Sequence, residues 1–162
     1  TPALFAVFPD AESMAAGDAE TVEELIRSTG FYKNKTKSLL GLARVLIEKY
    51  NGQLPKSMAE LVKLPGIGRK TANVIRINAF NLPGITVDTH CIRVSNRLGL
   101  TDKSDPTRIE LDLQQCFEEC DWAAWSHCVI FHGRYCCRAR NPSCERCVVS
   151  DLCAFYASNT QS

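Results

Sequence analysis

The sequence has almost no net charge, and this absence limits how the chain could attract a polyanion. Its 19 lysines and arginines are balanced by 18 aspartates and glutamates, so the formal net charge is +1. No global positive field would draw in a nucleic acid. If the chain binds one, local basic groups and oriented backbone amides must hold it.

Long apolar runs, internal repeats, low-complexity segments and β-type alternation are also missing. No run is long and apolar enough to span a membrane, and residues 1–8 lack the basic flank of a signal peptide. The hydrophobic content of 45% is that of a globular protein and not of a disordered one. We therefore expect an intracellular, all-α globular protein with no membrane partner.

The nine cysteines cannot all pair with one another, because their number is odd. An odd count argues against the closed disulfide framework of a secreted protein. Four of them, Cys137, Cys144, Cys147 and Cys153, follow the spacing C-x6-C-x2-C-x5-C within one short tail. Thiolates at this spacing can bind a tetrahedral zinc ion or an iron–sulfur cluster. Structural zinc sites more often pair two C-x2-C motifs, so the single motif favours iron–sulfur, and zinc stays open.

The remaining cysteines and the basic residues of the tail have less specific interpretations. We expect five cysteines in or near the core as small hydrophobic residues: Cys91, Cys116, Cys120, Cys128 and Cys136. Arg138 and Arg140 lie between the first two spaced cysteines. Their guanidinium groups could grip phosphates or belong to an ordinary solvated surface.

Apolar residues recur at helical spacing along most of the chain. One helix is expected over residues 1–8, and another runs from a cap at Asp18 to Ile26. Ser57-Met58-Ala59-Glu60 has the pattern of a capping box. Further helical segments are expected over residues 39–50, 72–79, 89–94, 106–119 and 121–131.

The segment Leu64-Pro65-Gly66-Ile67-Gly68-Arg69-Lys70-Thr71-Ala72 lies between two helical segments. Its glycines and proline predict a tight hairpin where another backbone can come close. The first N–H groups of the following helix have no partner inside that helix, which suits a phosphate oxygen. Lys70 lies in the first turn, where the helix dipole opposes a cation and favours the neutral, nucleophilic amine. A glycine-rich connector with an exposed lysine is the alternative.

Asp88 stands where a helix begins, so its ordinary role there is an N-cap. One helix and one turn separate it from Lys70, which would let the chain fold back and bring the two into one cleft. A carboxylate beside such a lysine can stabilise positive charge developing on a sugar and assist proton transfers. Both roles stay open on the residues alone.

These motifs occur together in one family. The hairpin segment, Val87-Asp88-Thr89-His90, His132-Gly133-Arg134-Tyr135 and the four spaced cysteines resemble endonuclease III. That family consists of bifunctional DNA glycosylases of the helix-hairpin-helix superfamily that carry a [4Fe–4S] cluster. The resemblance covers nearly the whole chain. It implies an all-α fold of two lobes: a helical domain with the hairpin over residues 1–83, incomplete at its N-terminus, and an iron–sulfur cluster domain over residues 84–162.

By the same resemblance, Lys70 is the catalytic nucleophile and Asp88 is the catalytic carboxylate. The expected cluster ligands are Cys137, Cys144, Cys147 and Cys153. The expected DNA-binding residues are Leu64, Gly66, Gly68, Arg69 and Thr71 of the hairpin segment, with Arg138 and Arg140 of the cysteine loop. The partner would be damaged double-stranded DNA, bound by a monomer that is cytoplasmic or nucleoid-associated.

The resemblance also implies a reaction. The damaged pyrimidine is flipped out of the duplex, Lys70 attacks the sugar carbon C1′, and the base leaves as a Schiff base forms. β-Elimination then cuts the strand 3′ to the abasic site. The family's substrates are oxidised pyrimidines such as thymine glycol, together with abasic sites. Adenine glycosylases of the superfamily usually carry serine where Lys70 stands, so the lysine favours lyase activity.

Two departures from the family keep alternatives open. The resemblance predicts roughly fifty further residues ahead of the position of Thr1, by the size expected of such a domain. Val62 stands where the family often has an acidic residue, and Asn141 where it often has a basic one. The alternatives are a catalytically weak DNA-binding module, a monofunctional adenine-type glycosylase and a zinc-stabilised helical interaction domain.

Overall fold

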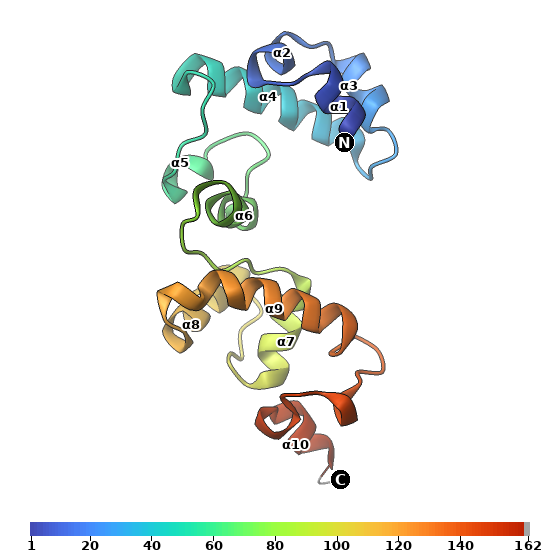
Figure 1. Cartoon of the computed structure of the whole chain (residues 1–162), viewed down its shortest axis with the longest axis vertical. Helices are drawn as coiled ribbons and strands as arrows, with labels where there is room; N and C mark the ends of the chain where they lie inside the picture. Colours follow the sequence, from blue (N-terminus) through green and yellow to red (C-terminus); the bar gives the residue numbers. More distant parts are fainter. Residues whose placement is uncertain (161–162) are drawn as a thin grey trace. The chain divides into compact units, whose positions relative to one another are not determined.

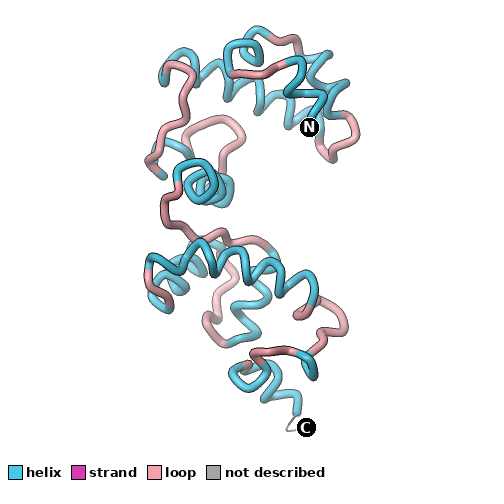
Figure 2. Tube along the Cα trace, in the orientation of Figure 1, coloured by secondary structure: helices cyan, strands magenta, loops and turns pink. Residues whose placement is uncertain are grey.

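The computed structural model describes residues 1–160. Within them the regular secondary structure is all helical, with no β-strand (Figure 1). Figure 2 shows the same path as helices joined by loops. The α-helices are α1 (Pro2–Val7), α2 (Ala11–Ala16), α3 (Ala19–Ile26), α4 (Tyr32–Tyr50), α5 (Met58–Leu61), α6 (Arg69–Phe80), α7 (Thr89–Leu98), α8 (Pro106–Cys116), α9 (Trp122–Tyr135) and α10 (Ala154–Thr160). Short 3-10 turns are η1 (Glu119–Asp121), η2 (Cys144–Arg146) and η3 (Ser150–Leu152). The predicted all-α class is confirmed. No helix among the described residues has the length and apolar character needed to cross a membrane.

The chain divides into two compact units, Thr1–Gly68 and Arg69–Ser162. The boundary falls directly before α6, so the hairpin closes the first unit and Lys70 belongs to the second. The domain division at residues 83 and 84 stays a prediction.

The first unit has its own hydrophobic core, built by α1 to α4. Buried apolar residues of the four helices form it: Leu4, Phe8, Met14, Val22, Ile26, Leu40 and Ala43. Asp18 caps α3 as expected, because its side chain accepts a hydrogen bond of 2.9 Å from the Thr21 N–H. A fully buried aliphatic side chain stabilises a fold by about 1.5–3 kcal/mol, so this cluster holds α1 to α4 together.

The hairpin is anchored to α4 within the first unit. Gly66 has a φ of +74°, which favours glycine, and a Cβ there would stand 2.6 Å from the Cβ of Ser38. Pro65 lies against Gly41, whose added Cβ would stand 3.4 Å from the proline ring. The Ser38 side chain of α4 therefore occupies the space that a Cβ at Gly66 would need, and the approach of a second backbone stays a prediction. Gly68 differs, since an added Cβ there would meet nothing within 4 Å.

The second unit has a separate core formed by the extended segment after α6, by α7, by α8 and by α9. Its buried members are Ile85, Val87, Cys91, Val94, Ile109, Leu113 and Val129. The buried Ser126 of α9 accepts a 2.9 Å hydrogen bond from the Thr86 N–H, which fixes the extended segment to α9. This segment leads directly into Asp88.

One local prediction is wrong, and one helix lies where none was expected. Ser57 does not cap α5 with its side chain, because the Glu60 N–H that a capping box would use donates instead to the Ser57 carbonyl at 3.2 Å. α5 is a single tight turn, so the backbone satisfies that donor itself. The helix α10 lies in a stretch where the sequence shows little periodicity, and it was not predicted.

The expected burial of five cysteines holds for Cys91 and is wrong for three others, since Cys116, Cys120 and Cys128 are exposed. Cys116 is the last residue of α8, and Cys120 belongs to η1, which has no buried residue. The buried face of α9 follows Ser126, Val129 and Gly133 at helical spacing, and Cys128 is off that face.

Candidate active site and metal centre

Lys70 is the second residue of α6, and its side chain is exposed. The leading N–H groups of a helix have no acceptor within it, and their dipoles make this end positive. Gly68 comes directly before this helix, and a Cβ added at Gly68 would meet nothing within 4 Å beyond its chain neighbours. An exposed amine in the first turn of a helix is accessible to DNA, and the N–H groups at that helix start can bind a phosphate oxygen.

Arg69, one of the expected DNA-binding residues, is engaged within the protein. Its Nε donates to Glu110 of α8 at 2.7 Å and its second nitrogen donates to the other carboxylate oxygen at 3.0 Å. The Glu110 side chain is 4% exposed and that of Arg69 is 40% exposed. The hydrogen bonds to Glu110 raise the pKa of the guanidinium. The pair fixes the start of α6 on α8, and sequence patterns gave no signal of it.

We expect Arg69→Ala to lower the free energy of unfolding by about 3 kcal/mol, because it leaves a buried carboxylate without its ion-pair partner and with only a 3.5 Å hydrogen bond from Gln114. Glu110→Ala should cost clearly less, since the partly exposed guanidinium then turns to water. Urea unfolding of both variants and of the double variant measures this. A larger cost for Glu110→Ala than for Arg69→Ala would contradict the asymmetry.

Asp88 is the N-cap of α7, with its Oδ1 accepting hydrogen bonds of 2.8 Å from the N–H groups of both His90 and Cys91. The N-cap interpretation is therefore correct as far as local structure goes. The cap uses one oxygen, and no hydrogen bond to Oδ2 is found within the described part of the chain. One carboxylate can thus cap a helix and keep an oxygen for substrate.

Asn73 of α6 ties the helix of Lys70 to the segment that carries Asp88. Its side chain is buried and donates a hydrogen bond of 2.8 Å to the Ile85 carbonyl. Gly84 allows the contact, because a Cβ there would stand 2.7 Å from the Asn73 Oδ1. The sequence motif includes Asn73 without indicating this role. A polar residue at a buried position of a helical pattern is the signal that could have found it.

Two arginines of α7 hold the start of the cysteine loop. Arg93 donates to the carbonyls of Cys137 at 3.2 Å and Gly133 at 2.8 Å. Arg97 donates to the carbonyl of Arg138 at 2.7 Å and to that of Ala139 at 3.1 Å, and a nitrogen of its guanidinium lies 3.3 Å from the Cys137 sulfur. The helix capped by Asp88 therefore also positions the first expected cluster ligand. Sequence reasoning assigned neither arginine this role.

The four spaced cysteines line a single cavity. Burial raises the pKa of the Cys144 thiol, and the nearby thiols of Cys137, Cys153 and Cys147 raise it further. All four cysteines thus border the same space. Four converging thiols suit an iron–sulfur cluster, because coordination to metal offsets the repulsion between thiolates. The donor set fits that cofactor.

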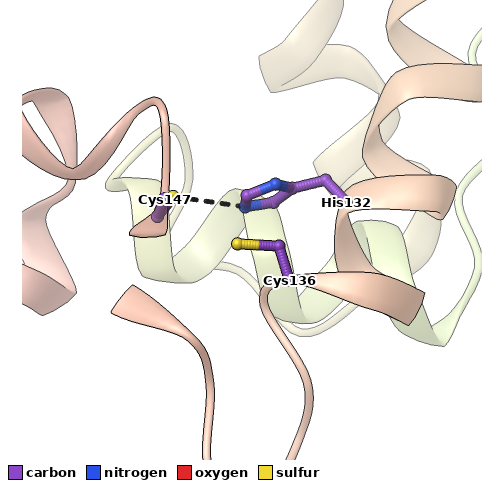
Figure 3. Close-up of side chains that lie close together, drawn as sticks. All are labelled: His132, Cys136 and Cys147. Carbon is purple, nitrogen blue, oxygen red and sulfur yellow. Dashed lines mark hydrogen bonds between the residues drawn. The ribbon is translucent and has the colours of Figure 1, made fainter. Parts of the chain in front are cut away.

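The same cavity contains a donor group that the spacing motif does not include. The Nε2 of His132 and the sulfurs of Cys136 and Cys147 lie within 4.8 Å of one another, and Figure 3 shows these side chains converging. His132 and Cys136 lie one turn apart at the end of α9, and His132 Nε2 is 3.9 Å from the Cys147 sulfur. Burial lowers the pKa of His132. Cys136 is half-buried.

Arg138 and Arg140 are both exposed on the loop. Arg138 donates to the Ser143 hydroxyl at 3.4 Å. Asn141 has a φ of +51°, a conformation that asparagine tolerates better than most residues. The loop therefore presents guanidinium groups to solvent, although their contact with DNA stays a prediction.

The comparisons with known proteins agree with this geometry. Residues 1–119 match the HhH-GPD superfamily of base excision DNA repair proteins, and residues 137–153 match the iron–sulfur binding domain of endonuclease III. Endonuclease III of Synechocystis sp. is 50% identical over 154 residues, which are 94% of this chain and 70% of the relative.

Two solved structures resemble the chain strongly. A non-covalent endonuclease III–DNA complex is 39% identical with a TM-score of 0.92, covering 99% of this chain and 76% of that one. A trapped endonuclease III–DNA covalent intermediate is 40% identical with a TM-score of 0.90, covering 97% of this chain and 74% of that one.

The fold and the cysteine loop define an all-helical protein of the helix-hairpin-helix class that performs base excision DNA repair. Within that class, the chain belongs to the endonuclease III family. Its cofactor is a [4Fe–4S] cluster, as the sequence predicted.

Proposed function

We propose that this chain excises oxidised pyrimidines from double-stranded DNA and cuts the strand at the abasic site, with Lys70 as nucleophile and Asp88 as the essential carboxylate. As a member of its family the chain is a DNA glycosylase and AP lyase, and it binds DNA. One observation carries the residue assignment: Lys70 is exposed in the first turn of α6, in the same unit as the carboxylate of Asp88, whose second oxygen is left over by its helix cap.

The reaction follows from these groups. The damaged nucleotide leaves the base stack, because its glycosidic bond is out of reach inside the duplex. Lys70 Nζ attacks C1′ and displaces the base, and ring opening gives a Schiff base. Loss of a proton from C2′ then expels the 3′ phosphate by β-elimination. Asp88 stabilises the positive charge that develops on the sugar and moves protons with its second oxygen.

The hairpin segment holds the DNA backbone in this proposal. The leading N–H groups of α6, with those of Gly66 and Gly68, bind phosphate oxygens. Leu64 is buried and its carbonyl accepts a 3.1 Å hydrogen bond from the Ile67 N–H, so it shapes the hairpin and leaves phosphate contact to its neighbours. Arg69 acts through its main chain because Glu110 holds its side chain. Thr71 is exposed beside them.

The cysteine loop carries the second set of proposed DNA contacts. Cys137, Cys144, Cys147 and Cys153 hold the cluster, which when bound cross-links the loop and so supplies structure. The loop thereby presents Arg138 and Arg140 to a neighbouring phosphate. We further propose that the chain works as a monomer, in the cytoplasm or associated with the nucleoid.

Borohydride trapping tests the proposal directly. The iron-containing chain is mixed with a duplex carrying an abasic site or thymine glycol, and we expect a covalent protein–DNA adduct with both. A duplex with a tetrahydrofuran site is the matched control, because it lacks the aldehyde that forms a Schiff base. Binding without any adduct would favour the DNA-binding module. An adduct with the abasic duplex alone would contradict excision of oxidised pyrimidines.

A further inference from the structure

Cys136 is a fifth cysteine of the cluster cavity. It lines the same space as the four spaced cysteines, although it lies outside their C-x6-C-x2-C-x5-C spacing. Its backbone belongs to the loop framework, since its carbonyl accepts hydrogen bonds of 2.9 Å from the Arg138 N–H and 3.0 Å from the Ser143 N–H. These hydrogen bonds fix the backbone of Cys136 at the edge of the cavity that the four expected ligands line.

The distance to Cys147 indicates which corner of the cluster Cys136 faces. The two sulfurs lie within 4.8 Å of each other in one group with His132 Nε2 (Figure 3). Each corner iron of a cubane cluster takes one cysteine sulfur, and the cluster itself holds the sulfurs of different corners apart. Two sulfurs this close therefore fit one corner as alternatives. Cys153 lies elsewhere, against the Arg97 carbonyl at 3.4 Å.

We propose that Cys136 is a reserve ligand for the iron–sulfur cluster, able to take the corner iron that Cys147 binds. The exchange breaks one iron–thiolate bond and forms another. The Cys136 thiol gives up its proton as it binds, and the Cys147 thiolate takes one up as it leaves. No electron is transferred and no other reactant is needed. The inference rests on the assignment of the four spaced cysteines as ligands.

Iron and sulfide analysis of the whole chain, residues 1–162, purified without air, tests this exchange. We expect Cys147→Ala to keep most of the iron and the brown absorption, because Cys136 replaces the lost ligand. Cys136→Ala alone should match the wild type. The double variant should hold at least about tenfold less iron, since losing even an outer-shell partner can cost a site tenfold in metal affinity.

Cys153→Ala is the matched control, because no reserve thiol is proposed for its corner. We expect it to lose iron as the double variant does. Retention of iron by Cys153→Ala would overturn the ligand assignment and the proposal with it. Equal iron in Cys147→Ala and the double variant, whether high or low, would overturn the reserve-ligand proposal alone. If alanine at position 147 prevents folding, the iron content of Cys147→Ser is compared with that of the double variant Cys147→Ser, Cys136→Ala, because serine is a smaller change.

Alkylation of the native protein separates ligation from a structural role. Iodoacetamide should modify Cys136 in the wild type, with the exposed Cys116 and Cys128 as internal references. In Cys147→Ala, Cys136 should become protected while the reference cysteines stay reactive. Unchanged modification of Cys136 in that variant would show that its sulfur does not bind iron, and would overturn the proposal. This measurement does not depend on borohydride trapping, so its failure is distinguishable from failure of the proposed function.

Discussion

Lys70→Ala is expected to abolish both borohydride trapping and strand cleavage at an abasic site while leaving binding to damaged DNA largely intact. The Schiff base needs an uncharged primary amine at this position, and alanine supplies none. Lys70 is exposed at the start of α6, and alanine is a good helix former, so the fold should change by no more than about 0.5 kcal/mol. Gel analysis of trapped adducts and of cleaved strands measures both losses.

Lys70→Arg distinguishes the role of Lys70 as a nucleophile from its role as a positive charge. Arginine keeps the positive charge that attracts phosphate, and it does not lose its proton in proteins. This variant should therefore bind DNA at least as well as Lys70→Ala and give no adduct. Lys63→Ala is the matched control, an exposed lysine seven residues earlier whose loss should leave trapping unchanged. Trapping by Lys70→Arg, or equal loss of binding and cleavage in Lys70→Ala, would refute the nucleophile assignment.

The helical architecture could be predicted from the sequence because periodicity and caps are local signals. The cap at Asp18, the hairpin glycines and the helix starting after Asp88 all depend on residues within a few positions of one another. The false capping box at Ser57 shows the limit of such signals. In this one-turn helix the Glu60 N–H donates to the Ser57 carbonyl, so the donor that the capping box needs is already used.

The parts of the site that could not be predicted depend on contacts between distant segments. Glu110 meets Arg69 across 41 positions, and Arg97 reaches the cysteine loop across a similar separation. No spacing rule encodes such pairs. The sequence alone predicts Cys136 in or near the core, because the four-cysteine spacing uses its neighbour Cys137 and leaves Cys136 out. Only the folded loop brings its sulfur to Cys147.

Asp88→Asn is expected to lower the rate of base excision roughly 100- to 1000-fold while the protein stays folded. The amide oxygen of asparagine can still accept from the N–H groups of His90 and Cys91, so the cap of α7 survives. The lost charge at the helix N-terminus should cost no more than about 1 kcal/mol. Single-turnover excision of thymine glycol measures the rate, and thermal melting measures the stability.

Asp88→Ala provides the comparison that distinguishes the two roles of this carboxylate. Alanine removes the cap as well as the charge, so it should add a stability loss of about 1 kcal/mol to the same loss of rate. If Asp88 is the catalytic carboxylate, the two variants should therefore have similar excision rates and different thermal stabilities. If Asp88→Asn excises at the wild-type rate and only Asp88→Ala is impaired, Asp88 serves as a helix cap alone. The proton transfers would then belong to another group.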